Sequence, residues 1–278
     1  MVHFNQINDN VTIAQASTLK VNAVVVECDH YLMVIDTLLL PSDIKALKQF
    51  LQQKNKPLKY LINTHWHSDH CLGNQLLKDE DTLIIAHQDY LQTLLTERSV
   101  LKTSASHSVN RKDISHPNIF VHNDFCFKDE FTYHLIESPG HCYGAICILI
   151  EELKILITGD TILGYPENFF SIPYFYWGDE ISFMKSLKDL YRYNFEIIIP
   201  GHSEIQQKDL ILFYLQYLVR IIQKKDELLD KDLKITFEDL KKEITLESCM
   251  EVCEIRKLWV PEMHDLNLQK LFLTYFQK

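Results

Sequence analysis

The sequence predicts an α/β domain over residues 1–205 and a helical tail over residues 206–278. Up to residue 205, short apolar runs rich in Val and Ile alternate with segments whose apolar residues recur at helical spacing. This alternation is typical of a sheet covered by helices. From Gln207 onward the pattern is almost wholly helical, which indicates that the sheet ends before the tail begins.

The first elements are predicted to be a strand hairpin, a helix and a further strand. Residues 21–27 (VNAVVVE) and 31–36 (YLMVID) are apolar, β-branched runs separated by a polar turn, which favours a hairpin. Ser42 and Asp43 are typical helix-capping residues. The apolar residues that follow them at helical spacing are Ile44, Leu47 and Leu51. Residues 59–63 (KYLIN) form the next predicted strand.

The middle of the chain and the tail continue this pattern. A short helix is expected to begin near His70, and residues 97–118 are polar and aperiodic, which predicts a long surface segment. Further strands are predicted at 83–86, 118–122, 132–137, 145–150, 154–158 and 196–199, and helices at 88–96, 179–193 and 210–222. In the tail, Thr236 and Asp239 have the spacing of a helix-capping box.

Charge and composition narrow the class of protein. The chain carries 28 basic and 38 acidic residues, for a net charge of −10, so nucleic acid is a disfavoured partner. The first residues lack the basic and apolar regions of a signal peptide. No apolar run reaches the roughly 20 residues that a membrane span needs. We therefore expect a soluble, cytoplasmic protein whose partner is a small molecule and neither nucleic acid nor a membrane.

Residues that can bind a metal follow the predicted strands. His65, His67, Asp69 and His70 lie within six residues at the exit of one strand. Three more such residues stand beside a glycine at the ends of other apolar strands: His141, Asp160 and His202. Because strand ends at one edge of a sheet converge, we expect all seven side chains to assemble one site.

This ligand set suits two zinc ions. Zinc binds neutral imidazole and carboxylate, usually with four ligands, and a catalytic site leaves one position for water. Seven ligands are too many for one tetrahedral ion, but they suit two ions that share a carboxylate and a hydroxide. The first ion is predicted to bind His65, His67 and His141, and the second Asp69, His70 and His202, with Asp160 bridging them.

The motifs together resemble the metallo-β-lactamase superfamily. They are THWHSDH at 64–70, PGH at 139–141, GD at 159–160 and PGH at 200–202. The resemblance covers about residues 10–205 and includes the strand that ends in Ile35-Asp36-Thr37. It implies a four-layer αββα sandwich with a dinuclear site at one edge. Residues 206–278 would then be a helical C-terminal extension packed on this catalytic domain.

The resemblance also implies a metal-dependent hydrolase. Asp160 resembles the bridging aspartate of glyoxalase II-type thioesterases, lactonases and phosphodiesterases. We expect two zinc ions, with iron and manganese as alternatives, and a metal-bound hydroxide that attacks an ester, thioester or lactone carbonyl. Asp69 is the expected catalytic residue, because it would hold and orient this nucleophile as well as bind metal.

Three other functions stay open at this point. One is a β-lactam-hydrolysing enzyme, although such family members commonly have Cys or Ser at the place of Asp160. The second is a mononuclear iron enzyme similar to persulfide dioxygenases. The third is a non-catalytic, metal-containing binding protein of the same fold.

Some features have more than one interpretation. Asp36 is either a carboxylate that orients a ligand histidine or a turn-capping residue. The aromatic segment 165–177 is either a substrate wall or part of the core. The tail lines a substrate pocket, covers the sheet or forms a homodimer. Leu38 stands where the family usually has glycine.

Overall fold

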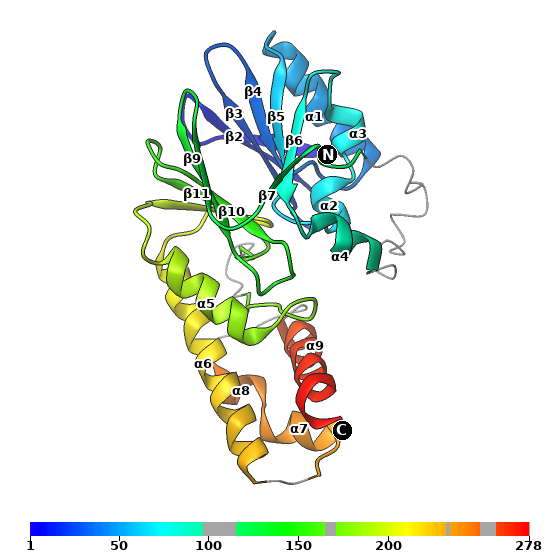
Figure 1. Cartoon of the computed structure of the whole chain (residues 1–278), viewed down its shortest axis with the longest axis vertical. Coiled ribbons are helices and arrows are strands. Elements are labelled where there is room, and N and C mark those ends of the chain that lie inside the picture. Colours follow the sequence, from blue (N-terminus) through cyan, green and yellow to red (C-terminus); the bar gives the residue numbers. More distant parts are fainter. Residues whose placement is uncertain (97–114, 165–170, 232–233, 251–259, 278) are drawn as a thin grey trace.

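The computed structural model describes residues 1–96, 115–164, 171–231, 234–250 and 260–277. Figure 1 shows two sheets in one half of the molecule and a group of helices in the other half. The sheets face each other, and helices cover the outer face of each. The predicted α/β class, the αββα layering and the helical C-terminal portion are therefore confirmed.

The first sheet has seven strands. Its strands β1 to β4 are antiparallel neighbours, whereas β4 to β7 run parallel. In spatial order they are β1 (Val2–Gln6), β2 (Val11–Ala16), β3 (Asn22–Glu27), β4 (Leu32–Ile35), β5 (Leu58–Ile62), β6 (Leu83–His87) and β7 (Ile119–Val121). Because β4, β5 and β6 are parallel, their carboxyl ends meet at one edge of the sheet.

The second sheet has five strands. In spatial order they are β12 (Ile197–Pro200), β11 (Ile155–Gly159), β10 (Ile146–Ile150), β9 (Thr132–Glu137) and β8 (Phe125–Lys128). Strands β11 and β12 are parallel, and Gly159 pairs with Pro200 at their carboxyl ends. The residues that follow these two strands are therefore brought to the same place.

The core lies between the two sheets. Alternate residues of the strands point into it and are almost completely buried. They include Ile13, Val24, Val26, Met33 and Ile35 from the first sheet, and Leu135, Ile146, Ile148, Ile155 and Ile157 from the second. The other face of each sheet packs against the outer helices. Apolar side chains therefore lie between the two sheets and between each sheet and its helices.

Helices form the two outer layers. On the first sheet, α1 (Pro41–Gln53) and α3 (Asn74–Leu77) pack through Leu47 and Leu77. On the second sheet, α5 (Glu180–Leu190) and α6 (Asp209–Asp230) pack through a set of large apolar side chains. That set includes Phe183, Leu187, Ile211, Tyr214 and Leu218.

The remaining helices extend the second layer or lie at the edge of the sandwich. They are α2 (Ser68–Cys71), α4 (Tyr90–Thr96), α7 (Phe237–Glu243), α8 (Leu246–Cys249) and α9 (Val260–Leu271), and a π-helical turn (Phe272–Phe276) follows α9. Leu240 and Leu268 of the tail belong to the same apolar cluster as Leu156 of β11. One continuous core therefore joins the second sheet to the tail.

Several predicted element boundaries differ from the structure. Ser42 and Asp43 do not cap α1, which begins at Pro41 after Leu40, because proline already has the backbone angle of a first helical residue. The helix expected near His70 is two short helices, with Gly73 between them. Most of the predicted surface segment 97–118 lies outside the described residues.

Three strands were missed from the sequence, namely β1, β2 and β8. Of these, β2 lies inside the first sheet and is largely buried. Strands β1 and β8 lie at the edges of their sheets, and most of their residues are exposed. Such strands lack the apolar alternation that marks a buried face, so the pattern gives little signal for them. The capping box at Thr236 and Asp239 is present as predicted, with both hydrogen bonds formed.

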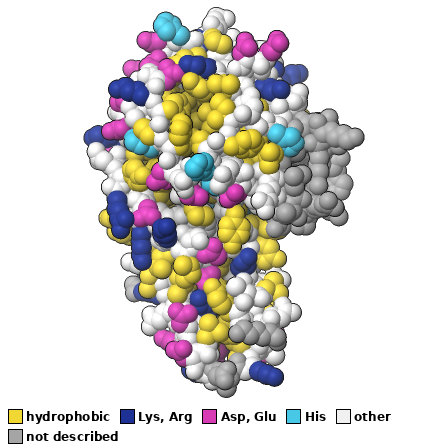
Figure 2. Space-filling view, in the orientation of Figure 1, with side chains coloured by type: hydrophobic (Ala, Val, Ile, Leu, Met, Phe, Trp, Pro, Cys, Tyr) yellow, Lys and Arg dark blue, Asp and Glu magenta, His cyan; other side chains and the backbone are white. Residues whose placement is uncertain are grey.

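Charged side chains of both signs occur on the face of the molecule that Figure 2 presents. Figure 2 shows Lys and Arg side chains interspersed with Asp and Glu on the face it presents. Within the described ranges, no helix combines the length and the apolar character that crossing a membrane would require.

Candidate metal centre

All seven predicted ligands meet at one end of the sandwich. Four follow β5 and lie in or before α2, which is at the end of the sandwich that faces the helical half (Figure 1). The others follow β9, β11 and β12 as His141, Asp160 and His202. They form two groups of potential ligands, one of His65, His67, His141 and Asp160 and one of Asp69, His70 and His202. Within each group the ligand atoms lie within 4.8 Å of one another.

The carboxylate of Asp160 lies between the two groups. Its Oδ2 is 3.7 Å from His65 Nε2 and 3.5 Å from His141 Nε2. Its Oδ1 is 3.2 Å from both His70 Nε2 and His202 Nε2. Each oxygen therefore faces a different group, which is the arrangement that a bridging carboxylate requires.

Several buried polar atoms at this centre have no hydrogen-bond partner among the described residues. They are Nε2 of His65, of His67 and of His70, and Oδ1 of Asp160. In addition, Nε2 of His141 and Nδ1 of His67 lie only 3.0 Å apart. Leaving buried polar atoms unpaired is costly, and cations bound among them would satisfy Nε2 of His65 and of His70 and Oδ1 of Asp160. The donor set of imidazoles and carboxylates fits zinc.

The protonation states differ between the two groups of ligands. Burial, reinforced by neighbouring histidines, holds the pKa of His65 and of His67 well below the usual range. Burial acts to raise the pKa of Asp160, but His202 and His70 outweigh it and hold that pKa well below its usual value. Burial acts to lower the pKa of His70 and of His202, but the carboxylates of Asp160 and Asp69 outweigh it and raise both. Neutral imidazoles bind metal ions, so a metal at the second group would displace protons from these two histidines.

The other ring nitrogen of most ligand histidines is held by the protein. Nδ1 of His141 lies 2.9 Å from the backbone oxygen of Tyr174, and Nδ1 of His202 lies 2.8 Å from that of Leu19. Because these oxygens can only accept, each Nδ1 carries the proton and each Nε2 is free to face the centre. Such contacts fix the tautomer and the ring orientation of a metal ligand.

Asp36 holds His70 in the same way. Its Oδ2 lies 2.8 Å from His70 Nδ1, and its two oxygens also accept hydrogen bonds from the backbone and hydroxyl of Thr64. The structure thus favours the interpretation of Asp36 as an orienting carboxylate. Asp36 has a φ of 62°, a conformation that is uncommon for residues other than glycine and that is often found at functional sites.

The metal centre requires a residue without a side chain at position 201. A Cβ atom added there would overlap Oδ1 of Asp160. The reason for glycine at this position is therefore space beside the bridging carboxylate. This explains why a glycine precedes the predicted ligand His202 in the sequence.

Leu38, which stands where the family usually has glycine, has a backbone conformation that favours glycine. Its φ is 65°, in the left-handed region. Its side chain is fully buried in the apolar cluster that contains Ile44 and Leu47 of α1. Burial of this side chain compensates for the unfavourable backbone conformation.

The described part of the aromatic segment packs in the core at one end and lies near a predicted ligand at the other, and a role as a substrate wall stays a prediction. Residues 165–170 lie outside the described residues. Phe175 is fully buried in the core around the second sheet. The Trp177 ring lies 6.3 Å, centre to centre, from the ring of His67.

Asn267 in α9 was not predicted as a functional residue. Its side chain donates to the backbone oxygen of Pro173 at 2.7 Å and accepts from the backbone nitrogen of Phe175 at 3.0 Å. These two residues flank Tyr174, whose carbonyl holds His141. No local motif marks such a residue, because its partners lie more than 90 positions away in the chain.

Comparison with known proteins points to one family. The family described as the metallo-beta-lactamase superfamily matches residues 17–202. A beta-lactamase-like protein 2 homolog from Caenorhabditis elegans is 26% identical over 242 residues, which are 83% of this chain and 68% of that protein. A hydroxyacylglutathione hydrolase from Pelagibacter ubique is 30% identical over 122 residues, which are 44% of each chain. The latter match thus spans less than half of that relative.

Solved structures share the fold. A metallo-beta-lactamase from Pontibacter korlensis superposes with a TM-score of 0.66 and 16% identity, over 79% of this chain and 99% of that one. A double mutant of the sec-alkyl sulfatase PisA1 superposes with a TM-score of 0.74 and 15% identity, over 99% of this chain and 50% of that one. At such identities the likeness concerns the fold alone. The family match over residues 17–202, together with the strand-end histidines and aspartates, shows that this chain belongs to the metallo-β-lactamase superfamily.

Proposed function

We propose that this chain is a dinuclear zinc-dependent hydrolase of an ester, thioester or lactone. The observation that supports this best is the position of Asp160, with one oxygen toward His65 and His141 and the other toward His70 and His202. A single tetrahedral ion would need only one of these groups. His67 would complete the first set and Asp69 the second.

Different residues of the chain would have different roles in catalysis. Bound zinc ions supply an activated water at neutral pH and polarise a carbonyl group. Asp69 is the ligand we assign to catalysis, because its Oδ2 lies 3.4 Å from His202 Nε2 and 3.6 Å from His70 Nε2 and its side chain keeps some solvent exposure. A carboxylate there can orient a water molecule and accept its proton.

Among the three carbonyl classes, the thioester has the most support. One relative is named as a hydrolase of hydroxyacylglutathione, and an acylglutathione is a thioester. The presence of Asp160, where β-lactam-hydrolysing members commonly have Cys or Ser, makes a lactam the less favoured substrate. We therefore place acyl thioesters first in a substrate panel, followed by lactones and simple esters.

Metal analysis and turnover test this proposal on one sample. We expect about two equivalents of zinc per chain and hydrolysis of at least one thioester, lactone or ester. His65→Ala and His202→Ala should each lose metal, because the two residues belong to different groups. One equivalent of iron with oxygen uptake would contradict the proposal in favour of the dioxygenase alternative. Two ions without turnover of any substrate would favour a binding protein.

We also propose how the chain divides into a domain and an extension. We keep residues 1–205 as the catalytic domain and residues 206–278 as an extension packed on it. The cluster that contains Leu156, Leu240 and Leu268 supports this packing. The cytoplasmic location and the homodimer considered from the sequence stay predictions.

A further inference from the structure

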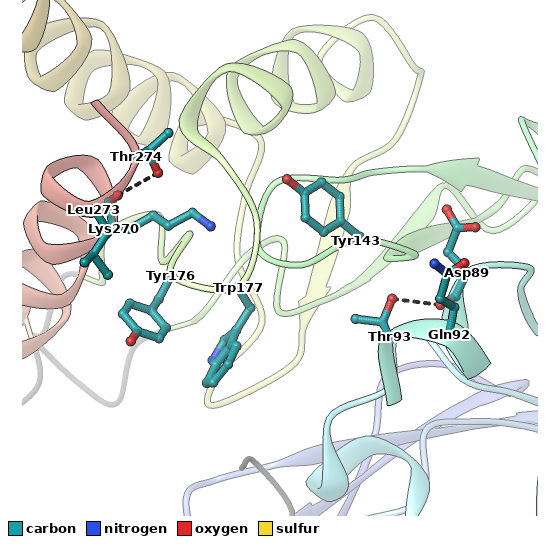
Figure 3. Close-up of a pocket in the computed structure, with 9 residues that line it drawn as sticks. All are labelled: Asp89, Gln92, Thr93, Tyr143, Tyr176, Trp177, Lys270, Leu273 and Thr274. Atoms are coloured by element: carbon teal, nitrogen blue, oxygen red, sulfur yellow. Dashed lines mark hydrogen bonds between the residues drawn. The ribbon is translucent and has the colours of Figure 1, made fainter. Parts of the chain in front are cut away.

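A cavity lies between the C-terminal helix and the edge of the sandwich that carries the metal centre. Its volume is about 550 Å³. Figure 3 shows residues of α4, the loop after β9, the segment before α5 and the end of α9 around it. The lining residues are Asp89, Gln92, Thr93, Tyr143, Tyr176, Trp177, Lys270, Leu273 and Thr274. A cavity of this size suits a small organic ligand.

One wall of the cavity is shared with the metal centre. Trp177 lines the cavity, and its ring lies 6.3 Å from the His67 ring and 6.1 Å from the Trp66 ring. The backbone of Trp177 also pairs with that of Cys142, which follows the ligand His141. Trp177 therefore borders both the cavity and the first group of ligands.

The cavity has one cationic side chain, Lys270, which is partly buried. Figure 3 shows it extending from α9 toward Tyr143. None of the described residues forms an ion pair with it, although the chain as a whole has ten more acidic than basic residues (38 − 28). Elsewhere in the tail, Lys225 pairs with Glu180 at 2.9 Å and Lys241 pairs with Asp265 at 2.6 Å. The charge of Lys270 is thus available to a ligand.

The acidic residue of the cavity does not neutralise this charge. Asp89 lies at the far side, beyond Tyr143 as seen in Figure 3, and its Oδ2 is 3.7 Å from Nδ1 of His87. Between the two charges the walls are aromatic, formed by Tyr143, Tyr176 and Trp177. The cavity therefore offers aromatic rings for contact, with the Tyr176 and Trp177 rings nearly perpendicular to each other, and a cation at its α9 end.

The walls are held in place before any ligand arrives. Asn267 lies one helical turn before Lys270 and binds the backbone on both sides of Tyr174, at Pro173 and Phe175. These bonds fix α9 relative to the segment that carries Tyr176 and Trp177. A pocket that is already ordered costs less conformational entropy when a ligand binds.

We propose that this cavity binds the non-reacting part of the substrate, and that this part is a flat apolar group that bears a carboxylate. Lys270 would be the counter-ion of the carboxylate, and Trp177, Tyr176 and Tyr143 would contact the flat group. This inference rests on the proposed hydrolase function and deepens it. It names the substrate class as carboxylate-bearing acyl compounds rather than neutral esters or lactones.

Binding of two matched probes tests the site without requiring turnover. The probes are 2-naphthoate and 2-naphthylmethanol, which share the ring system and differ in charge. Titration calorimetry on the zinc-loaded protein should show about tenfold tighter binding of the naphthoate, which corresponds to about 1.4 kcal/mol. Lys270→Met should abolish this preference. The control Lys188→Met, an exposed lysine on α5, should retain it.

The outcomes separate this inference from the proposed function. If Lys270→Met keeps the tenfold preference, the carboxylate binds elsewhere, for example at the metal ions, and the inference is wrong. Weak or equal binding of both probes to the unaltered protein also overturns it. If the preference depends on Lys270 but no acyl compound is hydrolysed, the binding site is retained and the hydrolase proposal fails.

A second variant tests the aromatic walls. Tyr143 is 49% exposed, so Tyr143→Ala should not disturb the core. It should weaken binding of both probes by about fivefold, because both lose the same apolar contact. Unchanged binding of both probes to Tyr143→Ala would place them outside this cavity and overturn the inference.

Discussion

The carboxylate of Asp36, at the end of β4, accepts a hydrogen bond from Nδ1 of His70 at 2.8 Å. Through this bond one strand of the first sheet orients a ligand that follows the neighbouring strand. Asp36→Ala should reduce the affinity for the second zinc ion by about 10–100-fold and leave the first ion bound. Competition with a chelating dye measures both affinities. Asp81→Ala, at an exposed position, is the control, and equal affinities in both variants would contradict the role of Asp36.

Asp160→Asn keeps the size of the side chain and removes its charge. The two ions would lose the anion between them, so we expect loss of one equivalent of metal. We also expect a fall in kcat of at least about tenfold, or roughly 1.4 kcal/mol of transition-state stabilisation. Metal content, melting temperature and kcat are measured on the same preparation. Two full equivalents of metal with unchanged kcat would remove Asp160 from the centre.

Asn267→Ala should weaken binding of the first zinc ion, which is assigned to the group that contains His141. Without the Asn267 side chain, the backbone around Tyr174 is no longer fixed, and the carbonyl that holds His141 can move. The first ion should therefore be bound more weakly, while the second keeps its affinity. The same dye competition gives the comparison with Asp36→Ala, which is expected to have the opposite selectivity. Equal weakening of both ions would mean that Asn267 acts only on general stability.

His264 should make the tail sensitive to acid. Burial lowers the pKa of His264 below its usual value of 6.5, and its two ring nitrogens are held by Tyr217 Oη and the backbone oxygen of Ile244. The folded state therefore favours the neutral ring. Its contribution to stability is complete above about pH 6.5 and is lost as the pH falls toward the lower folded-state pKa, because the unfolded chain binds the proton first.

Melting temperatures at pH 8 and pH 5 check this expectation. The decrease between the two pH values should be smaller in His264→Gln than in the unaltered protein by roughly 2 °C. His122→Gln, at an exposed position, should show the full decrease. An identical decrease in all three proteins would mean that His264 does not titrate differently on unfolding.

Leu38→Gly should destabilise the protein although it restores the residue usual in the family. Glycine relieves about 1–2 kcal/mol of strain at a φ of 65°. Removal of a fully buried leucine side chain costs about 3–5 kcal/mol. We expect the free energy of unfolding to fall by about 2 kcal/mol in denaturant titrations. A more stable variant would show that the backbone conformation dominates at this position.

The meeting of the seven predicted ligands at one place could be predicted because each follows a strand that the sequence marks. His65, His67, Asp69 and His70 fall within one loop and helix, and the strands before Asp160 and His202 are apolar enough to be predicted. The convergence of these strand ends then follows from general rules of sheet geometry.

The supporting residues could not be predicted in this way. Asn267 and Lys270 matter through contacts made across the fold, and neither stands in a motif. The cap of α1 was assigned wrongly because Ser42 and Asp43 are good caps in isolation, whereas Pro41 decides where that helix begins. Positions of this kind depend on tertiary packing, which residue spacing does not report.

The shared apolar cluster has a consequence for how the molecule unfolds. Leu156 of the second sheet, Leu187 of α5 and Leu268 of α9 belong to one set of mutually packed side chains. The tail is therefore not an independently detachable module, since its removal would expose the outer face of the second sheet to water. Sheet and tail should melt in one cooperative transition, and a chain shortened at residue 205 should aggregate rather than remain folded.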